Sequence, residues 1–235
     1  MQQGVWWSSV VVLVACGGPD EYPPISEDID APRAIDARPI DAGADAALAA
    51  GRVCLISDLR VLDACAASGA GGLTVTVDGV SSTTNADGSF LYSAPGGAAT
   101  WTVTGGTIVK SVVPLAGGAD VLLPAITTAD YTTLVDANLA TVGNGQGSVV
   151  VSLTKNSSPV VGATVVVNLG EGTSLYDTTS ATTWGRTSTG ALGMAWLPGH
   201  NVGSRTLIIT PAGSTGVTKT VSVVDQAITF VTFAL

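Results

Sequence analysis

Few side chains in this sequence could do chemistry. Its 235 residues contain one histidine, His200, and three cysteines, Cys16, Cys54 and Cys65. This count nearly excludes histidine-built metal sites and catalysis that needs several histidines. The patterns G-x-S-x-G, C-x-x-C, H-E-x-x-H and the phosphate-binding loop do not occur. His200 lies in a predicted loop, and the sequence places no nucleophile or orienting acid beside it. We therefore expect a protein that is not an enzyme and has no cofactor.

The acidic side chains form no pair or cluster that the sequence makes readable. Asp78, Asp120 and Asp136 are scattered, so a glycosidase-type carboxylate pair is disfavoured. Asn85 and Asp87, with Asp78, offer oxygen atoms, but the other ligands and the final Glu of a calcium loop are missing. We expect no metal site. The 18 acids and 9 bases give a net charge of −9, which argues against a nucleic-acid partner.

Cys16 ends a short apolar segment near the N-terminus. Val5–Ala15 contains eleven uncharged, mostly apolar residues. A helix needs about 20 such residues to cross a bilayer, whereas this length is typical of a signal peptide. Leu13-Val14-Ala15-Cys16 resembles the bacterial lipobox, which implies that Cys16 carries diacylglycerol and that the chain is cut before it.

The residues on either side of the apolar segment add two points to this resemblance. Gly17, where inner-membrane lipoproteins carry Asp, implies the outer membrane, so the first expected partner is a membrane bound through the lipid. Residues 1–32 contain no Lys or Arg, which departs from the usual basic start of a signal peptide. The alternatives are an ordinary secretory peptide and a buried strand, and the lipoprotein signal is favoured over both.

Residues 16–50 are interpreted as the lipidated Cys followed by a disordered tether rich in Asp, Ala and Pro. From residue 17 this stretch holds five of the eleven prolines and eight of the eighteen acids. It repeats Ile-Asp-Ala three times and has few large apolar residues, so it cannot offset its ordering entropy by burial. A helix over Asp41–Ala50 and a cation site in the acidic run are less favoured alternatives.

Cys54 and Cys65 remain as an even pair once Cys16 carries lipid. In an oxidising compartment such a remainder predicts a disulfide. By the chain-entropy estimate, closing a loop of about a dozen residues stabilises the fold by roughly 3 kcal/mol. Two buried thiols are the alternative, and a zinc pair is disfavoured because no further ligands accompany these cysteines.

From Gly51 onward, short apolar runs rich in Val, Thr and Ile alternate with turn residues. This pattern predicts an all-β fold built from sandwiches. Strands are expected at Val53–Leu55, Leu73–Val77, Trp101–Val103, Ile108–Leu115, Val149–Leu153, Ala163–Leu169, Arg205–Thr210, Val217–Val224 and Ala227–Ala234.

The second half of the sequence repeats features of the first at an offset of about 104 residues. Asn85-Ala86-Asp87-Gly88 predicts a tight hairpin that directs Phe90 into the core. Pro95-Gly96 and a strand from Trp101 follow it. In the second half, Thr189-Gly190 precedes Pro198-Gly199 and a strand from Arg205.

These residues resemble the carboxypeptidase-regulatory-like and prealbumin-like β-sandwich modules of bacterial surface proteins. That family shows P-V-x-G-A-x-V, a T-x-x-x-G-x-F-type hairpin, a P-G and a valine-rich strand. The second module matches most fully, at Pro159–Val165, Thr187–Gly190 and Pro198–Gly199. The first begins instead with the segment that carries Cys54. The resemblance covers about three quarters of the chain and implies fold more than function.

The expected organisation is therefore a signal peptide (1–15), the tether (16–50), a first Ig-like or prealbumin-like module (51–126), a linker (127–146) and a second module (147–235). A short helix is predicted near Asp130–Leu139, with Thr128 or Asp130 as N-cap. Its apolar face would carry Tyr131, Leu134, Val135 and Leu139.

Trp184 is the one candidate ligand-binding residue. Trp101 and Trp196 lie in apolar runs and are expected in the core, whereas polar residues precede Trp184 and Gly185-Arg186 follow it. An exposed indole could stack on a sugar ring or a partner. A loop Trp folded onto the edge of the sandwich is the favoured alternative. The leading hypothesis is a lipid-anchored, non-enzymatic envelope protein for structural or adhesive contacts, with an envelope protein as possible partner. The alternative is a lipoprotein that binds carbohydrate or another polymer through Trp184.

Overall fold

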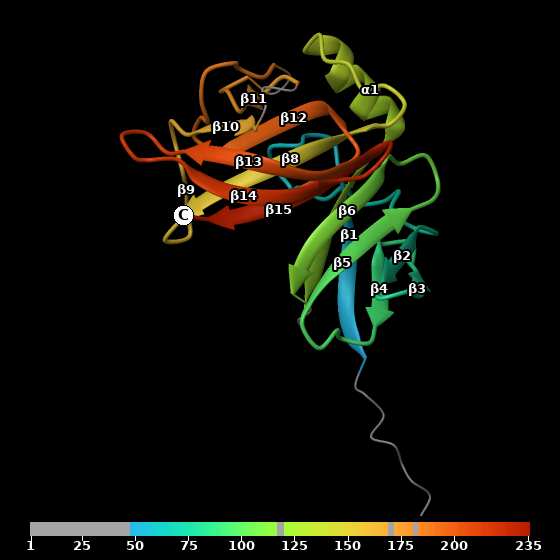
Figure 1. The fold of residues 1–235 in the computed structure, drawn as a ribbon. Helices are drawn as coiled ribbons and strands as arrows, with labels where there is room; N and C mark the ends of the chain where they lie inside the picture. Colours follow the sequence, from blue (N-terminus) through green and yellow to red (C-terminus); the bar gives the residue numbers. More distant parts are fainter. Residues whose placement is uncertain (1–47, 117–119, 169–171, 181–182) are drawn as a thin grey trace, which may run out of the picture. The chain divides into compact units, whose positions relative to one another are not determined.

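The computed structural model describes residues 48–116, 120–168, 172–180 and 183–235. The predictions for the signal peptide, Cys16 and most of the tether lie outside these residues. The predicted end of the tether needs correction, because Ala49 and Ala50 pair with Tyr92 and Leu91 as the first residues of a strand. Apart from one helix, α1, the regular elements of the described part are all strands (Figure 1). The predicted all-β class is therefore confirmed. Within the described residues, no helix is both long and apolar enough to cross a membrane.

The strands and the helix follow one another in a regular order. They are β1 (Ala49–Ile56), β2 (Thr74–Val77), β3 (Val80–Thr83), β4 (Ser89–Tyr92), β5 (Ala98–Thr104), β6 (Lys110–Ala116), β7 (Val121–Ile126), α1 (Thr128–Ala137), β8 (Gln146–Lys155), β9 (Ser158–Pro159), β10 (Thr164–Val167), β11 (Leu175–Tyr176), β12 (Met194–Asn201), β13 (Gly203–Thr210), β14 (Val217–Val223) and β15 (Ala227–Ala234).

The strands before α1 form a first sandwich. A three-stranded sheet in the order β4-β1-β7 faces the strands β6-β5-β2-β3. Side chains from both layers share one core, in which Trp101 packs edge-on against Tyr92 with ring centroids 4.7 Å apart. Phe90 is buried in the same core, as predicted.

The strands after α1 form a second sandwich with the same connections. A three-stranded sheet, β10-β13-β14, faces β11-β12-β8-β15. β1 pairs antiparallel with β4 and parallel with β7, and β8 pairs antiparallel with β12 and parallel with β15. β5 lies between β2 and β6 just as β13 lies between β10 and β14. The internal repeat expected from the sequence is thus present in the topology.

The two sandwiches share a sheet. β15 pairs with β8 along its length and with β6 through Ala227↔Lys110, Ile228↔Ser111 and Thr229↔Val112. This pairing joins half of each sandwich into one nine-stranded sheet. Figure 1 shows β6 and β15 meeting where the two sandwiches adjoin. The described residues belong to one compact unit, Asp45–Leu235.

The central strands of the second sandwich are buried on both faces. Val149 and Val151 of β8 contribute to the core of that sandwich, whereas Val150 between them joins the core that includes Trp101. Covered on both sides, such strands carry continuous apolar runs instead of alternating ones. The cover on both faces explains why every residue from Ser148 to Val151 is buried.

Two local predictions need correction. Asn85–Gly88 is a tight turn with Gly88 at φ +85°, but it is not a hairpin, because β3 and β4 on its two sides belong to different sheets. The Asp-Gly hairpin of this sandwich is Asp78-Gly79, which joins β2 to β3 with φ values of +49° and +81°.

The linker helix begins earlier than predicted. α1 spans Thr128–Ala137, and its N-cap is Thr127, whose hydroxyl accepts the N–H of Asp130 at 3.0 Å. Tyr131 is the buried residue of the helix, and its hydroxyl hydrogen-bonds with Ser148 of β8. Leu139, expected on the apolar face, is 87% exposed because the helix has already ended at Ala137.

Candidate functional site

A disulfide closes a short loop after β1. The predicted pair Cys54–Cys65 is bonded, with a Cα–Cα distance of 4.7 Å. Cys54 is fully buried in β1 opposite Pro124 of β7. The N–H of Ala66 donates to the carbonyl of Leu55 at 2.8 Å, so the base of the loop is closed twice. We call residues 55–64 the stapled loop.

The stapled loop presents Arg60 to the second sandwich. Asp58 organises this side chain: its Oδ1 accepts Nε at 2.8 Å and its Oδ2 accepts Nη2 at 2.6 Å. Asp58 also accepts the backbone N–H of Arg60 at 3.0 Å. The guanidinium is thereby oriented while it is nearly fully buried. Such a bidentate pair is geometrically specific.

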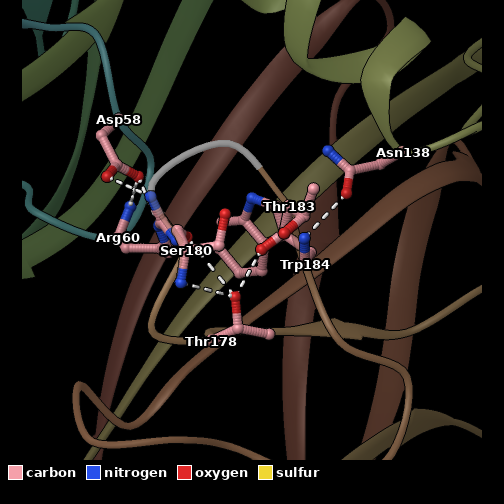
Figure 2. A network of polar contacts seen from close by, with 7 residues as sticks. All are labelled: Asp58, Arg60, Asn138, Thr178, Ser180, Thr183 and Trp184. Atoms are coloured by element: carbon pink, nitrogen blue, oxygen red, sulfur yellow. Dashed lines mark hydrogen bonds and ion pairs between the residues drawn. The ribbon is translucent and has the colours of Figure 1, made fainter.

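The remaining guanidinium edge contacts the segment after β11. Nη1 of Arg60 donates to the carbonyl of Ser180, which lies 120 residues away in sequence (Figure 2). The hydroxyl of Thr178 shapes this segment, because it donates to the carbonyl of Thr183 at 2.6 Å and accepts the N–H of Ser180 at 3.2 Å. One cation thus links the two sandwiches through a backbone carbonyl.

Trp184 lies beneath Arg60 and is buried. Its exposed fraction is 7%, and the guanidinium carbon of Arg60 is 5.9 Å from its ring centroid. Its ring is 5.6 Å from that of Trp196 in β12. The ring is thus folded into the protein, as the favoured interpretation of Trp184 predicts, and it is not the exposed indole that stacking on a sugar needs. Trp101 and Trp196 are core residues, as predicted.

Asn138 connects the helix to the same place. It is the C-cap of α1, and its side-chain oxygen accepts the N–H of Trp184 at 2.8 Å. Its Nδ2 donates to the carbonyl of Leu134, and its own carbonyl accepts from Arg186. The stapled loop, the end of α1 and the segment around Trp184 thus meet at one point (Figure 2). We call this meeting point the junction.

Asp177 has a structural role beside the junction. Its carboxylate is buried and accepts three backbone N–H groups at 2.8–2.9 Å, from Gly190, Leu192 and Met194. These bonds fix the turn that leads into β12. A buried carboxylate satisfied in this way is not available as a catalytic base.

The other candidate residues are dispersed. His200 is part of β12 and not of a loop, and it is buried close to Gly172. Asp78 and Asp120 are exposed at positive φ, and Asp136 is exposed on α1. Asp87 accepts the N–H and the hydroxyl of Ser89. Among the described residues, no His, Cys, Asp or Glu side chains gather into a possible metal site.

A groove with a volume of about 680 Å³ runs beside the junction, between the stapled loop, β6, β7 and β15. Its walls are mostly apolar, with side chains such as Leu62, Leu122 and Phe230. Its charged lining residues are Arg60 and Asp63, and Arg60 is already engaged by Asp58 and Ser180. This arrangement supports packing between the sandwiches and offers no acid–base pair.

Sequence reasoning missed most of the junction. Asp58 and Arg60, Asn138, and Ser180 lie in three segments that only the fold brings together. One local signal was available: Asp58 stands two residues before Arg60, the spacing of a turn in which an Asp side chain accepts a backbone N–H.

Comparisons with known proteins leave the family open. No protein family and no curated protein matches the sequence. GBS52, the minor pilin of Streptococcus agalactiae, is 10% identical, with 66% of each chain covered and a TM-score of 0.28. The Bacillus anthracis TIE protein is 12% identical over 80% of this chain, with a TM-score of 0.25. A streptococcal ancillary pilin is 11% identical over 81%, with a TM-score of 0.23.

The chain covers 66%, 34% and 63% of these three structures, respectively. Sequence identities of 10–12% and TM-scores of 0.23–0.28 assign the chain neither a family nor a function.

Proposed function

We propose that this chain is an exported, lipid-anchored protein of the bacterial cell envelope that displays two coupled β-sandwiches for structural or adhesive contacts. It performs no reaction and needs no cofactor. In this proposal residues 1–15 direct export, Cys16 carries the lipid in the outer membrane, residues 16–48 form the tether, and residues 49–126 and 147–235 are the two modules joined by 127–146.

The observation that carries the proposal is the way the polar residues are used. Arg60, Asp58, Asn138 and Asp177 are partly or fully buried polar residues, and each supports the junction or a turn. An enzyme would need some of these groups to face a substrate. Here they join the two sandwiches, which favours a protein whose task is to present a stable surface.

Export is supported by the disulfide. Structural disulfides persist in oxidising compartments and are rare in reducing ones. Cys54–Cys65 together with the apolar segment that ends at Cys16 is the combination expected of an exported protein. Anchoring by Cys16 rests on the lipobox resemblance.

Anchoring is tested with the full chain in a bacterial host. Cells are labelled with radioactive palmitate and fractionated into membrane and soluble parts. We expect label in the membrane form of the wild type and none in Cys16→Ser, because the lipid is attached through this sulfur. Cys54→Ser is the matched control and should keep the label. Equal labelling of Cys16→Ser would contradict the anchor.

Display is tested separately from anchoring. In one experiment, cells that carry the full chain are treated with protease, and we expect residues 49–235 to survive as a resistant fragment. In a second experiment, untreated cells are tested for attachment to envelope components and host-matrix surfaces. We expect cells that carry the chain to attach and cells that lack it not to attach. A chain that is cut between the sandwiches before any other site would argue against a coupled pair.

The alternative function is binding of carbohydrate through Trp184. The structure does not favour it, because Arg60 and Trp196 already cover this ring. A glycan array and polysaccharide pull-down with the full chain test it directly. Saturable binding that Trp184→Phe weakens, with unchanged unfolding, would make this the leading function. Absence of binding leaves the structural or protein-docking interpretation.

A further inference from the structure

The disulfide lies in the first sandwich, but the loop that it closes contacts the second. Leu59 is fully buried within the core that also contains Trp184 and Trp196. Arg60, the next residue, contacts Ser180 and Trp184. The two residues that extend from the stapled loop into the junction are therefore adjacent, midway between the two bonded cysteines.

We propose that the Cys54–Cys65 disulfide is a redox control of the junction: its reduction to two thiols loosens the contact of Arg60 with Ser180 and Trp184. This inference goes beyond the proposed function and does not depend on lipid at Cys16. It concerns how firmly one sandwich is coupled to the other.

The physical basis is the freedom of the stapled loop. With the disulfide closed, the ends of the loop are fixed and few loop conformations are accessible. Inside it, Asp58 accepts the N–H of Arg60 and thereby selects the orientation of the guanidinium. With the disulfide open, the loop gains conformations in which Arg60 no longer reaches Ser180. The contact with Ser180 then costs more ordering entropy to form.

The disulfide has one accessible side. Cys54 is fully buried, whereas Cys65 is half-buried and flanked by the exposed residues Ala64 and Ala66. A thiolate of a dithiol reductant therefore attacks Sγ of Cys65, and the Cys54 thiolate leaves and takes a proton. The second thiol of the reductant then closes its own disulfide and releases Cys65 as a thiol. Two electrons and two protons pass from the dithiol to the protein.

Reduction should loosen the junction without separating the sandwiches. The pairing of β15 with β6 contains no cysteine and remains after reduction. The expected change is therefore local, and it appears in a segment about 120 residues away from the disulfide.

The test is amide hydrogen exchange of the full chain, purified in detergent, before and after reduction with dithiothreitol. We expect peptides that contain Ser180 and Trp184 to exchange about tenfold faster after reduction. Peptides from β13 and β14 should be unchanged, because these strands lie in the opposite sheet of the second sandwich. Cys54→Ala/Cys65→Ala should reproduce the reduced state without any reductant.

A second variant separates the junction from general destabilisation. Arg60→Met keeps the disulfide and most of the apolar stem but removes the donor to Ser180. It should accelerate exchange in the same peptides, whereas Arg52→Met, at an exposed arginine with a bond to Asp87 within the first sandwich, should not.

Three results would overturn the proposal. The first is faster exchange in the stapled loop alone, which would show a purely local disulfide. The second is loss of protection throughout β2 and β5, which would show that the disulfide stabilises the first sandwich as a whole. The third is unchanged exchange of the Trp184 peptides in Arg60→Met.

Discussion

Arg60 of the first sandwich lies over the ring of Trp184 in the second, with 5.9 Å between the guanidinium carbon and the ring centroid. Asp58 holds this arginine through its Nε and Nη2, and the Ser180 carbonyl accepts from its Nη1. A cation over a desolvated indole contributes up to about 2 kcal/mol. Since the two residues belong to different sandwiches, this contact opposes their separation.

Trp184→Ala should lower the free energy of unfolding by about 3–5 kcal/mol, because it removes a large buried ring and leaves a cavity beside Trp196. Urea denaturation of the full chain measures the change. Leu139→Ala is the control, since a residue 87% exposed should shift stability by less than about 0.5 kcal/mol. A loss below about 1 kcal/mol for Trp184→Ala would contradict the observed burial.

Asp177→Ala should destabilise the fold more than Asp177→Asn. The alanine leaves three backbone N–H groups, those of Gly190, Leu192 and Met194, without their acceptor. A buried donor left without an acceptor costs about 1–3 kcal/mol, and the N–H of Met194 is in such a buried position. Asparagine keeps one oxygen, so part of the network survives. Urea midpoints of the two variants give the order, and equal midpoints would show that the carboxylate does not fix this turn.

Gly88→Ala should cost more than Gly79→Ala although both glycines have positive φ. A Cβ on Gly88 would lie 2.5 Å from the carbonyl oxygen of Val53 in β1, so the strand or the turn must shift. A Cβ on Gly79 would meet nothing within 4 Å, which leaves the backbone strain of about 1 kcal/mol. Thermal unfolding should rank the variants in this order, and the reverse order would refute it.

Asp87 should titrate at a pH below its ordinary pKa of 3.8, because hydrogen bonds from the hydroxyl and N–H of Ser89 favour its charged form. A pKa lowered on folding stabilises the fold above the unfolded value, and this contribution is lost as the pH falls through the folded value. NMR titration of the carboxyl carbon measures the midpoint. Ser89→Ala should raise it, and an unchanged midpoint would show that the hydroxyl does not act.

Tyr131 should make the fold less stable at high pH. Burial raises its pKa above the ordinary 10.0, and the bond with Ser148 offsets this only in part. A raised pKa gives stability that is complete below the unfolded value and declines as the pH rises through the folded one. From pH 9 upward, the free energy of unfolding measured in urea should fall more steeply in the wild type than in Tyr131→Phe. Parallel curves would contradict the raised pKa.

The sequence predicted the strands whose own residue composition favours β-structure. Val217–Val224 and Ala227–Ala234 have the composition of strands, and β14 and β15 lie there. β7 was missed because Pro124 interrupts its apolar run, and proline argues against a central strand. β7 is an edge strand of the β4-β1-β7 sheet, where a missing N–H is tolerated.

The pairing of β6 with β15 had no readable sequence signal, because it joins residues more than a hundred positions apart. The buried runs in β8 and β12 were a partial clue. Ser148–Val151 is buried without alternation, which indicates cover on both faces. The sequence does not say what provides this cover.

Trp184 shows the same limit at the candidate site. Its polar neighbours left an exposed ring open as an alternative, because the residues that bury it come from elsewhere: Arg60 from the stapled loop, Asn138 from the end of α1 and Trp196 from β12. The disulfide was predictable because the prediction needed only the number of cysteines and an oxidising compartment.

The parallel pairing of first and last strands sets how each sandwich responds to a pull. β1 lies beside β7 over six residue pairs and β8 beside β15 over seven, with both strands of each pair running the same way. Tension between the two ends of such a sandwich slides the paired strands past each other, so their hydrogen bonds share the load and break together. Antiparallel partners pulled from their open ends would instead separate one pair at a time. Each sandwich is therefore arranged to resist stretching along the chain.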